Sequence, residues 1–247
     1  DHAADDSRVQ ALVLDLRDLG RVGISKMLDI GDALKRFKAG KKPVYAYGEF
    51  FDQRRYFLAT YADQINMHPM GAVFLTGFGI YRNYYKTALE KLMVQFHVFR
   101  VGTYKSALEP FLRDDMSDYA REANLSWLTV LWDAYKAKVA NLRNLSPEDI
   151  DAYINNGPAL LARAEGDDAQ LALDYGLVDA IKTRDEMRDD LIQLVGEDDE
   201  EKTFNQIQFD KYLAAVKPEL EPVRPNQSKV AVIVAQGVIL SGNQPTG

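Results

Sequence analysis

Apolar residues along this 247-residue chain alternate between short unbroken runs and helically spaced positions. The runs at 9–16 and 43–47 are nearly continuous, which is typical of parallel strands that are buried on both faces. Between them, apolar residues recur at helical spacing over 24–37. Two further short strands are expected within 64–75. This alternation of strands and helices predicts an α/β domain with a mostly parallel sheet flanked by helices.

The pattern becomes mainly helical after residue 105. A helix at 84–93 and a strand at 95–101 are expected first, followed by a short helix at 107–113. Long helical patterns follow, each preceded by a residue that favours a helix start. Those residues are Ser117, Ser146 before Pro147, and Thr183 with Glu186 in the position of a capping box. We therefore expect a helical extension after Lys105.

The last part of the chain has a different composition. Three prolines lie between 218 and 225, which is typical of a linker. An apolar run then follows at 229–240 and predicts a new buried strand. We expect residues 1–217 to form one domain and 218–228 a linker. Residues 229–247 are then the first strand of a second domain that is cut short.

Composition excludes several classes of function. A net charge of −7 disfavours a nucleic-acid surface, so we expect no nucleic-acid partner. The chain has no cysteine, so disulfides, thiol nucleophiles and thiolate metal sites are excluded. Its three histidines are too few and too scattered for a metal cluster. We expect neither a metal nor a cofactor.

Lys105 is the candidate for chemistry. It follows an apolar stretch and Gly102, at the point where the helical pattern at 107–113 is about to begin. The positive end of a helix dipole disfavours a nearby cation, and a neutral lysine can act as a general base. The dipole supplies only about 0.3–1 kcal/mol, so burial must supply the rest. The aromatic residues expected to provide that burial are Phe96, Phe99, Tyr104 and Phe111. From the spacing alone, the alternative is an ordinary exposed lysine at the start of a helix.

Four segments carry a resemblance to a known family. They are ALVLDL at 11–16, KKPVYAYGEF at 41–50, HVFRVGTYKSALEPFLRDDMS at 97–117 and LALDYGLVDAI at 171–181. The chain resembles the long, tandem-repeat bacterial form of signal peptide peptidase A, also called protease IV. The similarity covers most of the chain, and 229–247 resembles the opening of the family's second repeat. The family's first strand and its N-terminal membrane anchor would precede Asp1.

The resemblance implies a crotonase/ClpP-like fold and a serine peptidase that works with a serine–lysine dyad. Lys105 matches the general-base lysine, which the first repeat contributes. The implied substrates are peptides, namely signal peptides released in the bacterial cytoplasmic membrane, with the catalytic part facing the periplasm. The implied partners are the chain's own second repeat and further copies in a homo-oligomer, a tetramer by resemblance. Membrane contact would come through the absent anchor.

The nucleophile is missing from the matching stretch of this repeat. Gln53 falls where the family has its serine, and Arg54 and Arg55 replace two glycines. An amide cannot attack a carbonyl as an alkoxide does. We therefore interpret residues 1–217 as a degenerate repeat that supplies Lys105 to a serine elsewhere, and we expect this chain alone to be inactive.

Gly77, Phe78 and Gly79 match the family's glycine-containing strand beside the substrate groove. A functional role would be backbone pairing with an extended peptide. The alternative is a turn or bulge, for which glycine pairs are equally suited.

Two other functions remain open from the residues. One is a non-catalytic assembly domain of an oligomeric crotonase-fold protein, in which the many aromatic residues form subunit contacts. The other is an acyl-CoA enzyme, which would share only the fold; fold alone does not establish function, and the segment around Lys105 argues against it.

Overall fold

The computed structural model describes residues 1–220, and these fall into two compact units. The first unit is Asp1–Phe204, and the second begins at Asn205. The predicted strand at 229–240 lies outside the described residues. The first unit contains the sheet and every candidate site residue.

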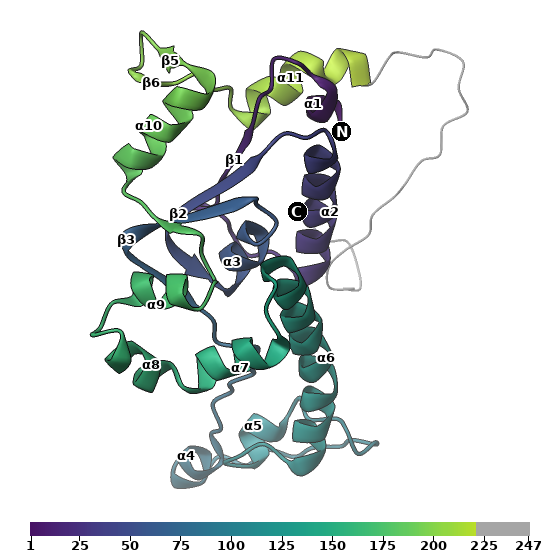
Figure 1. Ribbon diagram of the computed structural model, residues 1–247. Helices are drawn as coiled ribbons and strands as arrows, with labels where there is room; N and C mark the ends of the chain where they lie inside the picture. Colours follow the sequence, from purple (N-terminus) through teal and green to yellow (C-terminus); the bar gives the residue numbers. More distant parts are fainter. Residues whose placement is uncertain (221–247) are drawn as a thin grey trace, which may run out of the picture. The chain divides into compact units, whose positions relative to one another are not determined.

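Four parallel strands form the sheet of the first unit (Figure 1). They are β1 (Leu12–Asp15), β2 (Val44–Asp52), β3 (Gln64–Phe74) and β4 (Ala180–Ile181), in the spatial order β1-β2-β3-β4. The mostly parallel α/β sheet predicted from the apolar runs is confirmed. The two short strands expected within 64–75 are one strand, β3, with an irregular register opposite residues 48–50 of β2. Gly71 is required there, since a Cβ would lie 2.6 Å from the carbonyl oxygen of Glu49.

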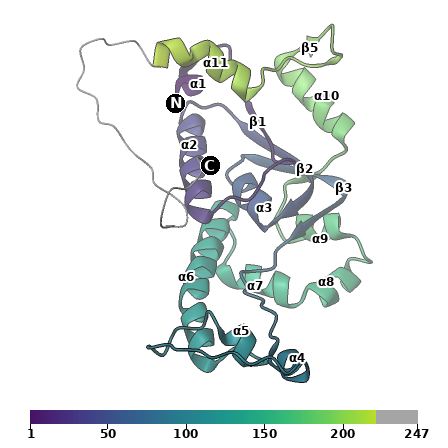
Figure 2. The ribbon, with the colours of Figure 1, turned by 180° about the vertical axis from the view of Figure 1, so that it is seen from behind.

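Helices enclose this sheet because their apolar faces need partners. Figure 2 shows α2 (Ile24–Ala39) on one side of the strands, with α9 (Asp168–Asp174) on the other. The short helix α3 (Gln53–Ala59) follows β2 directly and is buried from Tyr56 to Ala59. Val44, Ala46, Ile65 and Met67 form the buried centre of the sheet. A four-residue helix, α1 (His2–Asp5), precedes β1.

The predicted capping residues begin the later helices. Ser117 caps α6 (Asp118–Arg143), and complete capping boxes begin α7 (Pro147–Asn155) and α10 (Arg184–Val195). The sequence pattern did not predict the separate helix α8 (Gly157–Arg163). Tyr135 and Val139 of α6 are fully buried, which fixes the C-terminal half of α6 in the core.

Residues 80–116 form a segment that we call the arm. It contains α4 (Lys86–Lys91) and α5 (Glu109–Leu112), which contact each other and lie beyond the N-terminal end of α6 in Figure 1. The strand predicted at 95–101 is wrong, because these residues form neither strand nor helix. A strand needs a hydrogen-bonded neighbour, and the apolar run on the arm has none in the sheet.

The acidic segment near residue 200 and the last helix complete the described chain. Glu197–Asp198 (β5) and Thr203–Phe204 (β6) form a small antiparallel hairpin. In the second unit, α11 (Phe209–Leu220) includes the first three residues of the predicted linker. Within residues 1–220, none of the helices has the length and apolar character that a bilayer span needs.

Candidate functional site

Gln53 lies where strand β2 passes into helix α3. Asp52 ends the strand and caps the helix, and its carboxylate accepts hydrogen bonds from the backbone N–H groups of Arg54 and Arg55 at 3.0 and 2.9 Å. The cap satisfies two backbone donors that the first turn of a helix leaves without partners. Gln53 is thereby held at the first helical position, at the carboxyl end of a parallel strand.

Two arginines and one aspartate determine the local charge. Arg54 and Arg55 both face the carboxylate of Asp52, at 3.4 and 3.7 Å. The guanidinium of Arg55 also donates to the carbonyl oxygens of Leu16 and Arg17 at 3.0 and 2.7 Å. Burial raises the pKa of Asp52, but the backbone hydrogen bond from Arg55 and the two guanidinium charges outweigh it and leave that pKa below its usual value. The cluster keeps one positive charge in excess.

The side chain of Gln53 binds the backbone that follows the neighbouring strand. Its Oε1 accepts hydrogen bonds from the N–H groups of Thr76 and Gly77 at 3.2 and 2.8 Å. These residues come just after β3, whose end pairs with the end of β2, so parallel register brings them together. Gly77 has a φ of +74°, which glycine adopts without strain.

The stretch Gly77 to Gly79 is not a strand. These residues form neither helix nor strand, and β3 ends at Phe74. The structure therefore corrects the expectation of a glycine-containing strand here. The Gly77 N–H, which was expected to pair with a peptide, is already bonded to Gln53.

A cavity of about 190 Å³ adjoins Gln53. Two residues of α2 and the two residues just before it line the cavity, together with Gln53, Arg54, Phe78, Leu131 and Tyr135. Most of this lining is apolar. The hydroxyl of Tyr135 donates to the backbone oxygen of Gln53 at 2.9 Å, which ties α6 to the start of α3.

Lys105 lies elsewhere, on the arm. Its side chain is exposed, and it stands four residues before α5, which begins at Glu109. Its backbone oxygen accepts a hydrogen bond from the Arg100 guanidinium at 2.7 Å. The helix expected immediately after Lys105 starts later and is only one turn long, so Lys105 does not adjoin the N-terminus of a helix as expected.

The aromatic residues near Lys105 do not enclose it. Phe99 is 98% exposed and Tyr104 is 55% exposed. Phe96 stacks on Phe111 with ring centroids 4.8 Å apart, and Tyr104 meets Tyr119 edge to face at 5.8 Å. These rings pack with each other because the arm has no core to receive them. In the described part of the chain these rings do not shield the Lys105 amine, so that expectation is wrong.

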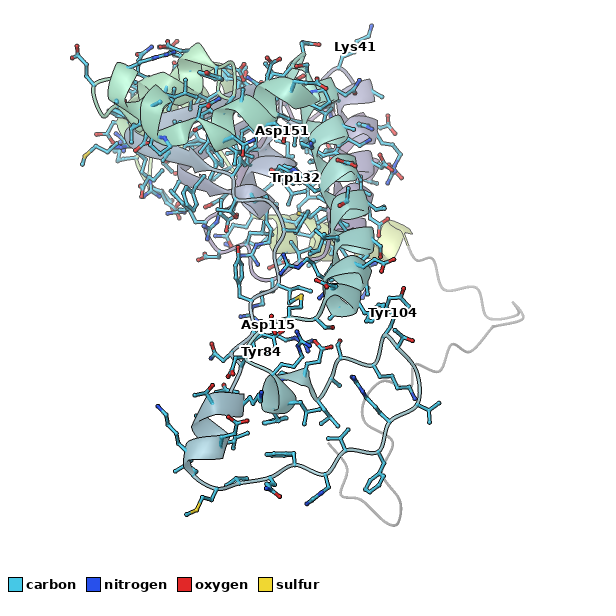
Figure 3. The ribbon with its side chains drawn as sticks, turned by 90° about the horizontal axis from the view of Figure 1, so that it is seen from below. Lys41, Tyr84, Tyr104, Asp115, Trp132 and Asp151 are labelled. Carbon is cyan, nitrogen blue, oxygen red and sulfur yellow. The ribbon has the colours of Figure 1, made fainter. Side chains whose placement is uncertain are left out.

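Lys105 and Gln53 are not brought together. Tyr104, beside Lys105, contacts Glu122 near the start of α6, whereas Gln53 contacts Tyr135. Thirteen residues separate those two positions on α6, which corresponds to about 20 Å along a helix at 1.5 Å per residue. Figure 3 shows Tyr104 on the arm and Trp132 farther along α6, toward the sheet.

Glu109 is a buried carboxylate that the sequence pattern did not reveal. It is 4% exposed, and its two oxygens accept hydrogen bonds from the hydroxyl and the N–H of Ser117, at 2.5 and 3.2 Å. Its own N–H donates to the Ser106 carbonyl at 3.1 Å. Glu109 therefore joins the segment after Lys105 to the start of α6. Its charge predicted exposure, and only the fold shows otherwise.

The composition of the chain led us to expect no metal site. Within residues 1–220, no group of three or more His, Asp or Glu side chains is arranged to hold a metal ion.

Comparison with known proteins gives a family match. The sequence profile of peptidase family S49 matches residues 36–197. "Protease 4" of Salmonella typhi is 39% identical over 249 residues, and the alignment covers 99% of this chain and 39% of that protein. "Protease 4" of Haemophilus influenzae is 37% identical over 241 residues, with 97% and 39% covered. The chain thus spans about two fifths of the length of these curated relatives.

Two further similarities are more distant. "Serine protease SPPA, chloroplastic" of Arabidopsis thaliana is 24% identical over 241 residues, covering 96% of this chain and 33% of that protein. Among solved structures, an enoyl-CoA hydratase/isomerase family protein from Silicibacter pomeroyi aligns with 16% identity and a TM-score of 0.22, covering 70% of this chain and 82% of that one. At that TM-score the alignment says nothing further about this protein.

Proposed function

The chain belongs to peptidase family S49, and from this premise we propose that it is the lysine-bearing part of a serine peptidase. Its relatives named Protease 4 confirm the resemblance to signal peptide peptidase A. In this proposal Lys105 is the general base, and the nucleophilic serine lies outside these residues.

The proposal is supported by the contacts of Gln53 and by the exposure of Lys105. Gln53, at the expected serine position, cannot act as a nucleophile, and its amide oxygen is engaged by two backbone N–H groups. Lys105 is exposed on the arm, about 20 Å along α6 from the contacts of Gln53. An exposed amine on a projecting segment is available to a group from another part of the protein.

The proposed reaction transfers one proton twice. Neutral Lys105 takes the proton from the serine hydroxyl, whose oxygen attacks the carbonyl carbon of the peptide bond. The resulting ammonium then gives the proton to the leaving amine, and water completes hydrolysis of the acyl-enzyme in the same way. A lysine becomes neutral more easily when water is excluded, so the partner segment must cover the arm around Lys105.

Segment 77–79 has a smaller role in this proposal than the resemblance implies. The N–H of Gly77 is bonded to Gln53, so a peptide can pair there only after Gln53 is displaced. We therefore propose that substrate pairing takes place mainly in the second repeat.

The decisive test substitutes Lys105 in the full-length protein. Lys105→Ala is expected to lower kcat by about 10²–10⁴-fold, which is the contribution that a general base typically makes. Lys138→Ala, on α6, is the matched control and should retain wild-type activity. Peptidase activity near the wild-type value in Lys105→Ala contradicts the proposal.

A second proposal concerns assembly, the alternative function that the sequence left open. Tyr81, Met93, Phe99 and Val101 on the arm are each more than 80% exposed. Large apolar residues exposed together favour a contact with another copy or with the rest of the protein. Phe99→Ser should lower the oligomer mass measured by light scattering on the full-length protein; an unchanged mass contradicts this use of the arm.

We further propose the substrates and location that the resemblance implies. Signal peptides at the bacterial cytoplasmic membrane would be cleaved on the periplasmic side, with a membrane anchor that precedes Asp1. Fractionation of cells that express the full-length protein tests the location. Recovery in the soluble fraction contradicts it.

A further inference from the structure

The cavity beside Gln53 is large enough to hold a small apolar group. Its volume is about 190 Å³. An apolar cavity of about 150 Å³ in another protein binds benzene, so this one has room for an isobutyl or benzyl group. Apolar residues from α2 and α6 and the ring of Phe78 line it. A ligand that fills this space must therefore carry an apolar chain.

The polar groups at the cavity offer hydrogen-bond donors. The Oε1 of Gln53 is engaged by Thr76 and Gly77, which fixes the orientation of the amide. Among the described residues, its NH₂ group has no hydrogen-bond acceptor, so two donors remain available on a side chain that lines the cavity. Arg54, which also lines the cavity, carries only donors. The ligand must then present acceptor oxygens.

Charge determines which acceptor fits. Arg54 shares the single carboxylate of Asp52 with Arg55, at a distance of 3.4 Å, and is 41% exposed. Arg55 is occupied by two backbone carbonyls as well. The excess positive charge at the cavity lies on Arg54, and guanidinium groups bind carboxylates with charge-assisted hydrogen bonds. A carboxylate complements the site better than a neutral amide.

We propose that this cavity is a non-catalytic binding site for a carboxylate attached to a short apolar chain. The apolar chain enters the cavity, and the carboxylate accepts hydrogen bonds from the NH₂ of Gln53 and from Arg54. The C-terminal residue of a peptide and a free branched-chain acid share this chemistry. The site goes beyond the proposed peptidase, because it uses the position at which the nucleophile is missing and does not involve Lys105.

Trp132 provides a direct measure of binding. It stacks on Tyr135 at 5.2 Å and meets Phe78 edge to face at 6.1 Å, and both of these residues line the cavity. The chain has two tryptophans, so Trp127→Phe leaves Trp132 as the only one. Fluorescence of this variant of the 247-residue chain is titrated with 4-methylpentanoate and with its uncharged amide. The acid should give a saturable change and should bind at least tenfold more tightly than the amide.

Three substitutions locate the site. Gln53→Glu keeps acceptors for Thr76 and Gly77 but replaces the donor NH₂ with negative charge, and should weaken acid binding at least tenfold. Arg54→Met should weaken it at least tenfold, since a hydrogen bond to a charged group is worth about 1.5 kcal/mol or more and about 1.4 kcal/mol is a factor of ten. Leu131→Phe fills part of the cavity and should weaken acid and amide alike. Arg188→Met removes an arginine that is similarly exposed and paired, and should change nothing.

The outcomes distinguish a peptide C-terminus from a free branched-chain acid as the ligand. They also distinguish failure of the cavity proposal from failure of the peptidase proposal. N-acetyl-leucine that binds as tightly as 4-methylpentanoate identifies a peptide C-terminus, and binding of 4-methylpentanoate alone identifies a small acid. Binding that survives Lys105→Ala shows that the site does not depend on the peptidase proposal. The inference is overturned if neither acid gives a saturable signal, if acid and amide bind equally, or if binding is unaffected by both Gln53→Glu and Leu131→Phe.

Discussion

Substitution of Arg143 should destabilise the first unit more than any surface ion pair would. Arg143 lies at the C-terminal end of α6 and its side chain is only 9% exposed. Its guanidinium donates to the Gly176 carbonyl at 3.0 and 2.8 Å and to the carboxylate of Asp179 at 3.0 and 2.8 Å. Asp179 also accepts from the N–H of Ile65 in β3 at 2.7 Å. Arg143 therefore fixes the end of α6 against the sheet.

The expected cost of Arg143→Met follows from these contacts. Removal of one partner from a fully buried ion pair costs about 3–5 kcal/mol. Asp179 is 35% exposed, so water will solvate part of its charge, and the lower end of that range applies. We expect a loss of about 3 kcal/mol in the free energy of unfolding. For a domain of this size, that corresponds to a melting temperature lower by roughly 6–12 °C.

Urea unfolding followed by tryptophan fluorescence measures this loss. Both tryptophans, Trp127 and Trp132, are in α6, so the signal reports on the helix that Arg143 holds. Arg188→Met is the control, because an exposed ion pair contributes only about 0–1 kcal/mol. A loss below 1 kcal/mol for Arg143→Met, or equal losses for the two variants, would refute the reasoning.

Two further predictions concern the N-terminal cap of α3 and the packing of α2 against Tyr61. In the folded protein the pKa of Asp52 is below its usual value, so its contribution to stability is present above about pH 4 and is lost as pH falls through the lowered pKa. Asp52→Asn should reduce the fall in unfolding free energy between pH 5 and pH 2, and an unchanged pH profile contradicts this. Gly31→Ala would place a Cβ 2.1 Å from the buried ring of Tyr61, and overpacking of about 1–3 kcal/mol should exceed the roughly 1 kcal/mol that alanine gains in a helix. Urea unfolding should show a less stable variant, and a more stable one would refute the argument.

Local signals predicted most elements of the first unit. The buried runs predicted β1 and β2 because a strand covered on both faces must be apolar along its whole length. Ser117, Ser146 and Thr183 marked helix starts because their side chains satisfy backbone N–H groups within a few residues. The strand predicted from the apolar run at 95–101 was wrong because that prediction, too, used only local residue preferences. Its residues favour a strand, but whether a strand forms depends on a neighbour that the pattern cannot show.

The family and the identity of Lys105 and Gln53 as candidates came from the sequence, because a linear motif preserves residue type and spacing. What those residues contact was decided only by the tertiary structure. Parallel register brought Gln53 to Gly77, a 26-residue helix brought Tyr135 to Gln53, and the arm held Lys105 away from both. Contacts between residues 24 to 82 positions apart depend on how strands pair and how helices pack, and neither is encoded in any short segment of the chain.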